Sequence, residues 1–343
     1  MRSTMKKIIY LLCVIFITAC SRTNSIDNIQ EHSVAIDREL PNLFLGKPSG
    51  IVVIDNYLVI ADYMGETLLT IYDLNTDSIV SRAINMGQGP NDLVPPIIIG
   101  ASHKERAIDV FQRRSSKYSV FLLDELLKGK SRKQNEVELS ESDRAISIPH
   151  GFLATGYYLD GLFRFFDYNG RVLSTEDVYP PYFQKLKDSG EKYKLGQSLF
   201  AYNRHCNVLM SASYFTGEVS FFLVDVKKMT MMQQVLLGDG GIEQKIESLG
   251  TNINIDADDI VYCYGAYSTD NNFYVLYSGK TMQEEQKQKQ GTYILEFDLK
   301  GQLKCRYKFT FPIVDMCITN EKKVYAISQS EDLEYVILSF NLR

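Results

Sequence analysis

The residue types that most often carry catalysis are sparse in this 343-residue sequence. Its four histidines are His32, His103, His150 and His205. A metal centre or an acid–base pair needs such side chains, or carboxylates, to converge on one site. His150 and His205 are expected near inner strands, but two histidines do not complete a three-ligand site. No G-x-S-x-G sequence and no recognisable Ser/His/Asp set occurs. We therefore expect no catalytic residues, no resident metal and no cofactor.

Two further segments have the composition of ligand sites. The acidic run Asp256-Ala257-Asp258-Asp259 is typical of calcium ligands, but it lacks the glycine and the distal glutamate of an EF-hand loop. We interpret it as a solvated turn. In the segment Gly87-Gln88-Gly89-Pro90, the glycines allow positive φ and the proline fixes the following turn. Its backbone N–H groups could hold an anion, and the alternative is a plain crossover between two sheets.

The N-terminus predicts export. Three basic residues precede an apolar run, Ile8 to Thr18, that is too short to span a membrane as a helix. The small residues Thr18 and Ala19 stand directly before Cys20, an order that resembles the lipobox of bacterial lipoproteins. That resemblance implies cleavage after residue 19, acylation of Cys20 and a membrane anchor without a spanning helix. Residues 21–27 are expected to form a tether. Surface-exported lipoproteins of the kind that this chain resembles carry an acidic run there, so the resemblance and the lack of such a run imply the periplasmic side of the outer membrane.

Composition excludes some functions and leaves one question open. The formal net charge is −5 and no basic cluster occurs, which argues against nucleic-acid binding. No second apolar run is long enough for a membrane helix. Beyond the leader and Cys20, the remaining cysteines are Cys206, Cys263, Cys305 and Cys317. In an oxidising compartment they form one or two disulfides, or else they are buried thiols.

Short apolar runs with period-2 alternation recur along the chain and predict an all-β protein. Only residues 122–127 and 280–290 are helix candidates, and for the second a solvated loop is the alternative. Six of the strands close with Asp or Asn before a turn, at intervals of 43 to 73 residues. These anchors are Asp73, Asp124, Asp167, Asp225, Asp298 and Asn341.

This repeat is typical of a β-propeller whose blades hold four strands each. We predict a six-bladed β-propeller over residues 28–343, with each anchor ending the third strand of a blade. The chain stops just after the sixth anchor, so residues 28–36 are expected to supply the missing strand and close the ring. The alternative is a pair of β-sandwich domains, whose nearest linker would be Tyr179 to Tyr182.

The segment Met86 to Asp92 resembles the G-x-G-P-G-E-F type motif of the TolB-like six-bladed β-propeller lipoproteins of Gram-negative gut bacteria. Leu93 stands where an aromatic residue is usual, and Asn91-Asp92 replaces Gly-Glu. The lipobox and the anchor phrases fit the same family. The resemblance implies the propeller fold and the location, and it implies little about chemistry.

In a propeller, the loops between second and third strands lie on the same face as the crossovers between blades. Polar and aromatic side chains in these loops suit a polar ligand, a peptide or a sugar, although the absence of Trp lowers the expectation of a sugar. The expected ligand-binding residues are Tyr63, Gly87, Gln88, Gly89, Arg113, Arg114, Asp160 and Tyr214. We expect a lipid-anchored, non-catalytic monomer that binds a protein partner or a small polar ligand. The alternatives are a hydrolase or lyase with its site in the central channel, and a scaffold of an outer-membrane complex.

Overall fold

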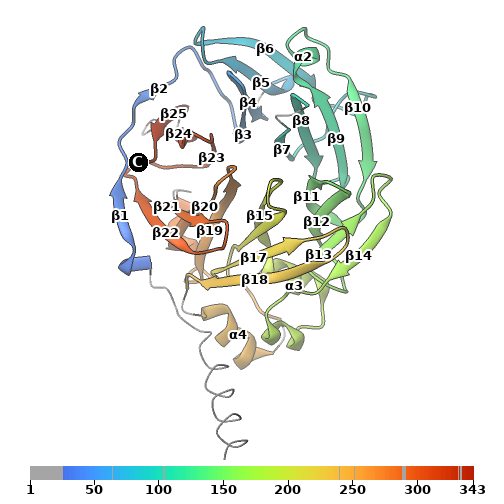
Figure 1. The fold of residues 1–343 in the computed structure, drawn as a ribbon, viewed down its shortest axis with the longest axis vertical. Helices are drawn as coiled ribbons and strands as arrows, with labels where there is room; N and C mark the ends of the chain where they lie inside the picture. The colour runs from blue at the N-terminus through green and yellow to red at the C-terminus, as the bar shows by residue number, and fades with distance from the viewer. Residues whose placement is uncertain are drawn as a thin grey trace, which may run out of the picture.

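The computed structural model describes residues 26–343, except residues 64, 103–104, 239, 251, 288–290, 331 and 333. The predicted signal peptide, Cys20, residues 21–25 and His103 lie outside the described residues. The described strands form six sheets arranged as blades around one axis (Figure 1). The predicted six-bladed β-propeller is therefore confirmed, and the β-sandwich alternative is wrong.

Five blades contain four strands and blade five contains five, and the first strand of each blade lies nearest the axis (Figure 1). From the axis outward, blades one to three are β3 (Pro48–Ile54), β4 (Tyr57–Asp62), β5 (Thr67–Asp73), β6 (Ser78–Asn85); β7 (Ile97–Ser102), β8 (Ala107–Gln112), β9 (Lys117–Leu122), β10 (Lys133–Glu138); and β11 (Ser142–Ile148), β12 (Gly151–Gly156), β13 (Phe163–Phe166), β14 (Val172–Glu176). Blades four to six are β15 (Ser198–Asn203), β16 (Val208–Ser213), β17 (Glu218–Val224), β18 (Met229–Leu236); β19 (Ile260–Ser268), β20 (Asn272–Thr281), β21 (Tyr293–Asp298), β22 (Leu303–Lys308); and β23 (Asp315–Ile318), β24 (Lys323–Gln329), β25 (Tyr335–Asn341) with β2 (Arg38–Glu39).

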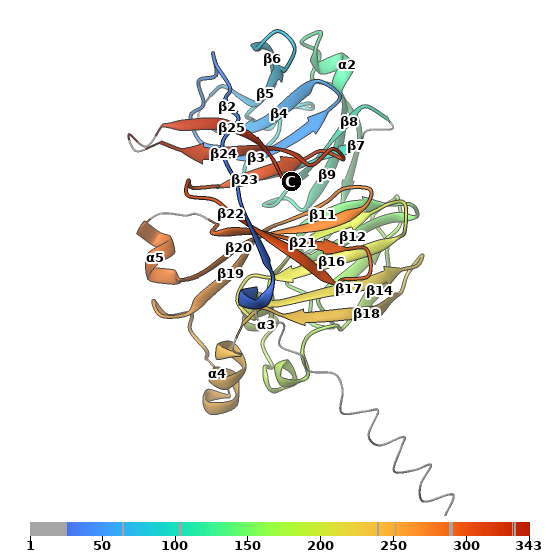
Figure 2. The same ribbon diagram turned by 60° about the vertical axis from the view of Figure 1, so that its left-hand side comes forward.

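An N-terminal strand closes the ring, as predicted, but the segment that completes blade six lies slightly later in the chain than expected. β2 pairs antiparallel with β25, with Arg38 opposite Ser339. The expected segment, residues 28–36, instead contributes β1 (Gln30–Ser33), which pairs in parallel with β22 as a fifth strand of blade five. The N-terminal chain therefore runs along the outer edges of two neighbouring blades (Figure 2). It covers two sheet edges that would otherwise be open to pairing with another chain.

Residues 26 and 27, predicted to belong to the tether, are instead part of the folded body. They begin a short 3-10 helix, η1 (Ile26–Asn28), at the edge of blade five. The Arg306 guanidinium donates to the Ile26 carbonyl at 2.9 Å and forms an ion pair with Asp27 at 3.2 Å. Ile26 also packs against the apolar cluster between blades four and five.

The hydrophobic core is divided among the interfaces between blades. One cluster joins Ile71 of blade one to Phe121 of blade two, and another joins Phe221 of blade four to Phe297 of blade five. Middle strands are covered on both faces by neighbouring blades, so all six residues of β12 are buried. Outer strands alternate, as in β22, because only one set of their side chains reaches the core.

The aspartate anchors mark strand ends for a local reason. The Asp167 carboxylate accepts the backbone N–H groups of Asn169 at 2.8 Å and Arg171 at 2.9 Å. Asp298 does the same for Lys300 and Gln302, both at 2.9 Å. These side-chain turns satisfy backbone donors where the third strand reverses into the fourth. All six anchors stand at or just beyond the end of a third strand, with Asp124 in α2 and Asn341 at the end of the C-terminal strand β25, which confirms the predicted repeat.

Four helical segments lie on one face of the propeller. We call it the loop face, because it carries the crossovers between blades and the loops between second and third strands. The four segments are η2 (Pro181–Lys185), α3 (Ser189–Gly196), α4 (Gly241–Leu249) and α5 (Met282–Lys287). The hairpins between first and second strands lie on the opposite face, as does α2 (Leu123–Leu126). The two predicted helix candidates correspond to α2 and α5, whereas η2, α3 and α4 were not expected.

The four described cysteines are free thiols. Cys263, Cys305 and Cys317 are buried and Cys206 is half-buried. Burial raises the pKa of the Cys305 thiol. Of the two alternatives left by the sequence, the structure supports buried thiols.

Candidate ligand-binding site

The predicted site residues all lie on the loop face, but several use their polar groups to hold the fold. The Tyr63 hydroxyl donates to the Ile97 carbonyl at 2.8 Å and accepts the Ile97 N–H at 2.9 Å. It therefore fixes the start of blade two. Asp160 pairs with Arg164 at 2.9 Å, and the Arg164 guanidinium stacks 3.9 Å from the Tyr158 ring centroid. These contacts lie between strands of blade three rather than at a ligand.

In the Gly87–Gly89 loop, a carboxylate of the protein already stands where an external anion could otherwise bind. The Asp92 carboxylate accepts the Gly89 N–H at 3.0 Å. A Cβ added at either glycine would lie 2.6 Å from the Asp92 Oδ2, so the glycines permit this close approach. Neither glycine has a positive φ, contrary to the expected reason for their presence. Gln88 is exposed. The crossover interpretation of this loop is therefore favoured over an anion site.

Arg113 is built into a hydrogen-bonded network at the inner edge of the loop face. Its guanidinium contacts both oxygens of Asp143, at 2.8 Å and 2.7 Å. The Tyr193 hydroxyl, from α3, donates to the same carboxylate at 2.7 Å. Burial lowers the pKa of Arg113 and Asp143 raises it, with a net upward direction. Arg114 is exposed, and no hydrogen bond or ion pair joins it to another described residue.

Next to this network, Arg144 carries a charge without a hydrogen-bonded partner among the described residues. Asp143 is the extra residue of an irregularity in β11, where Ser142 faces Gly156 and Arg144 already faces Thr155. Such bulges redirect side chains. Burial lowers the pKa of Arg144, and the Arg113 charge adds to this effect, whereas Tyr193, Asp143 and Asp315 oppose it. A guanidinium remains protonated at any physiological pH, so a half-buried positive charge persists here.

Asp315 lies on the inner strand of blade six, which is opposite blade three in the ring (Figure 1). Its carboxylate accepts the Tyr267 hydroxyl at 2.6 Å and the Ile51 N–H at 3.2 Å, so it ties blade six to blades five and one. Burial raises the pKa of Asp315 to about 6. No ion pair joins it to Arg144, although each charge influences the pKa of the other.

We call the group formed by Arg113, Asp143, Arg144, Tyr193 and Asp315 the axial site. Aromatic residues border it on the loop face: Tyr157 packs on Tyr193 at a ring distance of 4.7 Å, and Tyr214 packs on Tyr264 at 5.6 Å. The structure thus brings Arg113 and Tyr214 toward the axis with residues that the sequence interpretation missed. Arg144 and Asp315 lie at or near the start of inner strands, and a charge in such a strand was the available signal.

The remaining sequence candidates stay apart from this site. His32 stacks on Tyr307 at the edge of blade five, and His205 contacts Asp270 at 3.0 Å in an exposed hairpin. His150 lies in the first hairpin of blade three. In the described part of the chain, no three or more His, Cys, Asp or Glu side chains are grouped so that they could hold a metal.

The acidic run at residues 256–259 is neutralised internally. The Lys245 ammonium of α4 contacts Asp256 at 2.9 Å and Asp259 at 2.6 Å. Asp259 also accepts the Asp256 N–H at 2.6 Å. The interpretation as a turn is therefore favoured over a calcium site. Among the helices of the described ranges, none combines the length and the apolar character needed to cross a membrane.

Fold and site together define a six-bladed β-propeller with a charged axial site. The family model described as TolB-like 6-blade propeller-like matches residues 26–321. The chain belongs to this TolB-like family, as the resemblance of the Met86 to Asp92 segment implied. No curated protein matches the chain.

Solved structures share the fold at low sequence identity. A member of the DUF4221 family from Bacteroides vulgatus is 14% identical, with a TM-score of 0.61, and the match covers 91% of this chain and 98% of that one. A "putative exported protein" from Bacteroides fragilis is 13% identical, with a TM-score of 0.58, over 93% and 96% of the two chains. A luciferin-regenerating enzyme is 11% identical, with a TM-score of 0.52, over 90% and 96%.

Proposed function

We propose that this protein is an exported, lipid-anchored and non-catalytic binding module, which takes the anionic end of a small polar ligand or of a protein partner at the axial site. The observation that carries the proposal is Arg144. Its side chain is half-buried on the inner strand of blade three, and the described residues offer its guanidinium no hydrogen-bonded partner. Buried charges in proteins are normally paired because desolvation is costly. A carboxylate or phosphate would satisfy its planar donors in a bidentate manner.

The arrangement around Arg144 supports binding in a defined orientation. Arg113 is held by Asp143 and Tyr193, so its position is fixed before any ligand arrives. Asp315 stands on the opposite blade and would repel a second negative group, which favours ligands with one anionic end. Tyr157 and Tyr214 supply amphipathic surface at the loop face for the rest of the ligand.

The hydrolase or lyase alternative would have to use Asp315, because its pKa of about 6 suits a general base. However, both of its oxygens already accept hydrogen bonds, from Tyr267 and from Ile51, in contacts that join three blades. This structural engagement makes binding the better-supported function.

The proposed location rests on the N-terminal sequence, with support from the likeness to a Bacteroides fragilis structure described as a "putative exported protein". We propose acylation at Cys20 and residence as a monomer on the periplasmic side of the outer membrane. Cys20→Ala is expected to move the protein from the membrane fraction to the soluble fraction of broken cells. If that variant stayed in the membrane fraction, the proposed lipid anchor at Cys20 would be wrong, whereas the proposal for the axial site would be unaffected.

Calorimetric titration of the detergent-purified full chain with inorganic phosphate and with acetate, each of which carries one anionic group, tests the binding function. At a ligand concentration of about 100 Kd, binding should also stabilise the fold by about 2.7 kcal/mol. Arg144→Gln is expected to weaken binding at least tenfold, or by about 1.4 kcal/mol. Arg114→Gln, on the same face but exposed and unpaired within the described residues, is the matched control and should leave the affinity unchanged. Equal affinity in the wild type and Arg144→Gln would refute the proposal.

A further inference from the structure

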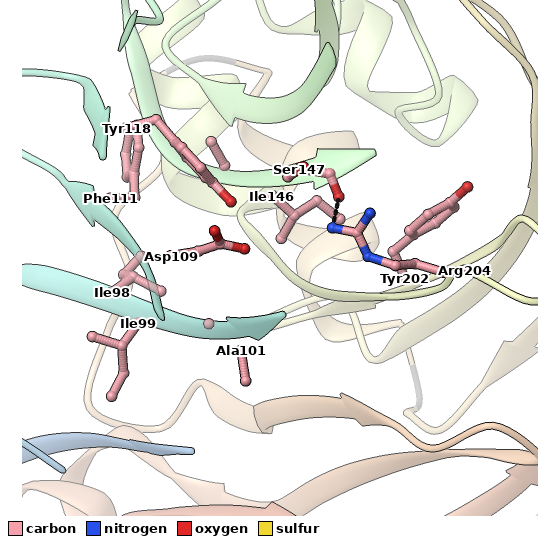
Figure 3. A pocket seen from close by; sticks show the side chains of 12 residues that line it. Ile98, Ile99, Ala101, Asp109, Phe111, Tyr118, Ile146, Ser147, Tyr202 and Arg204 are labelled. Atoms are coloured by element: carbon pink, nitrogen blue, oxygen red, sulfur yellow. Dashed lines mark hydrogen bonds between the residues drawn. The ribbon is translucent and has the colours of Figure 1, made fainter. Parts of the chain in front are cut away.

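A second binding space lies between blades two and three. Its volume is about 150 Å³, and its walls come from β7, β8, β9 and β11, with Tyr202 and Arg204 of blade four at its open side (Figure 3). It involves none of the residues that define the axial site. A cavity of roughly this volume accepts a ring the size of benzene in other proteins, so it exceeds the space of an isolated water molecule.

The cavity has apolar walls and carries opposite charges at two places. Ile98, Ala101, Phe111 and Ile146 supply apolar surface. Figure 3 shows the Asp109 carboxylate facing the cavity from blade two, while the Arg204 guanidinium lies across it from blade four. Such walls would bind an apolar group of a few carbon atoms, and the two charges would pair with an ammonium group and a carboxylate on the same ligand.

Both charged groups retain capacity for a ligand. Tyr118 and Asp109 both line the cavity, and no ion pair neutralises the Asp109 carboxylate within the described residues. Burial raises the pKa of Asp109, while Tyr118 and Arg204 oppose the rise. One Arg204 nitrogen donates to the Ser147 carbonyl at 2.9 Å, and this contact holds the guanidinium over the cavity. Its other N–H groups are not hydrogen-bonded within the described residues, and Arg204 is exposed.

We propose that this cavity binds a small zwitterion with an apolar side chain, that is, an α-amino acid of about leucine size. The ammonium group contacts Asp109, the carboxylate contacts Arg204, and the side chain lies against the isoleucines and Phe111. Gly100 belongs to the recognition surface because its lack of a side chain leaves the cavity open. A Cβ added there would meet only the Asp109 Cβ, at 3.6 Å, an ordinary contact.

Titration calorimetry of the detergent-purified full chain with L-leucine tests the site. Isoamylamine, which lacks the carboxylate, and 4-methylpentanoate, which lacks the amine, should each bind at least about tenfold more weakly than leucine. Asp109→Asn and Arg204→Gln should each reduce leucine affinity at least about tenfold, because each removes one charge-assisted hydrogen bond. Gly100→Val should abolish binding by filling the cavity.

Two variants serve as matched controls. Arg171→Gln changes another exposed arginine in a hairpin on the same face as Arg204, but outside the cavity, and should bind leucine normally. Arg144→Gln removes any binding of a ligand carboxylate at the axial site and should leave leucine binding in this cavity intact, so the titrations of leucine and its analogues are repeated in that background to separate the two sites. Because Arg204 is exposed, Arg204→Gln is expected to fold even if a core variant does not. The proposal is overturned if leucine does not bind, if both analogues bind as tightly as leucine, or if Gly100→Val and Arg204→Gln leave its affinity intact.

Discussion

Replacing Arg144 by methionine should stabilise the ligand-free protein while removing its anion site. The net lowering of the Arg144 pKa means that the fold disfavours the charged form, mainly through burial. For a base, a folded pKa below the unfolded value costs stability at every pH at which the group is charged. Replacement of buried charges by apolar side chains of similar volume has gained about 1–4 kcal/mol in other proteins. Arg144 retains contact with solvent at the axis, so we expect a gain of about 1–2 kcal/mol.

The assay is urea denaturation at neutral pH, with and without saturating phosphate. Arg144→Met should raise the midpoint in the absence of phosphate, with an unchanged slope. Phosphate should raise the midpoint of the wild type and leave that of the variant in place. This opposition between stability and binding is typical of functional residues. If Arg144→Met instead destabilises the ligand-free protein by more than about 1 kcal/mol, Arg144 is a structural partner of Asp143 and Asp315, and the reasoning for the axial site fails.

Three further predictions concern the surrounding fold. Lys322→Met should lower the free energy of unfolding, measured by urea denaturation, by about 3 kcal/mol. The reason is that Lys322 contacts the buried Glu296 carboxylate at 2.7 Å, and its removal leaves that charge without a cation. Adding Glu296→Gln should restore most of the lost stability. Gly89→Ala should lower the free energy of unfolding by about 1–3 kcal/mol, because the added Cβ clashes with the Asp92 carboxylate. In a protein that already carries Asp92→Ala, the same change should have no further effect. A remaining loss of stability in that background would contradict this explanation. Burial, with Glu243 nearby, raises the pKa of Glu218 to about 7, so the protonated form that stabilises the fold is lost as the pH rises from about 4.5 through 7. The free energy of unfolding of Glu218→Gln should therefore exceed that of the wild type by about 2–3 kcal/mol above pH 7 and equal it near pH 4. A difference that does not change with pH would contradict this assignment.

The strand pattern was predictable because its causes are local. Period-2 alternation and the aspartate turns depend on residues within a few positions of one another, and all six anchors fall where the repeat predicts. The closing strand was predicted in kind but was displaced in position. Its two residues, Arg38 and Glu39, carry no apolar pattern, and their place is set by pairing with β25 at the far end of the chain. Helices α3 and α4 escaped prediction because they are short and depend on packing against neighbouring loops.

The candidate site was predictable only as a face of the molecule. Tyr63 and Asp160 lie on the expected face, but partners from neighbouring strands occupy their polar groups. The sequence around Arg144 has the pattern of an ordinary strand. Arg144 is a candidate because the described residues do not provide a hydrogen-bonded partner for its guanidinium. Whether a side chain has such a partner depends on residues far away in the sequence, so the neighbouring sequence does not predict it.

The sequence by itself determined the six-bladed propeller, the positions of the loops and a charged leader that predicts export, because each depends on short-range pattern or composition. Only the tertiary structure decided which side chains meet. In the axial site, Arg144 of blade three and Asp315 of blade six are close enough for the charge of Asp315 to influence the pKa of Arg144. In the second cavity, Asp109 of blade two and Arg204 of blade four line the same space. Ring closure brings these residues together over long sequence separations, and burial between blades gives their charges a strength that solvent would otherwise screen.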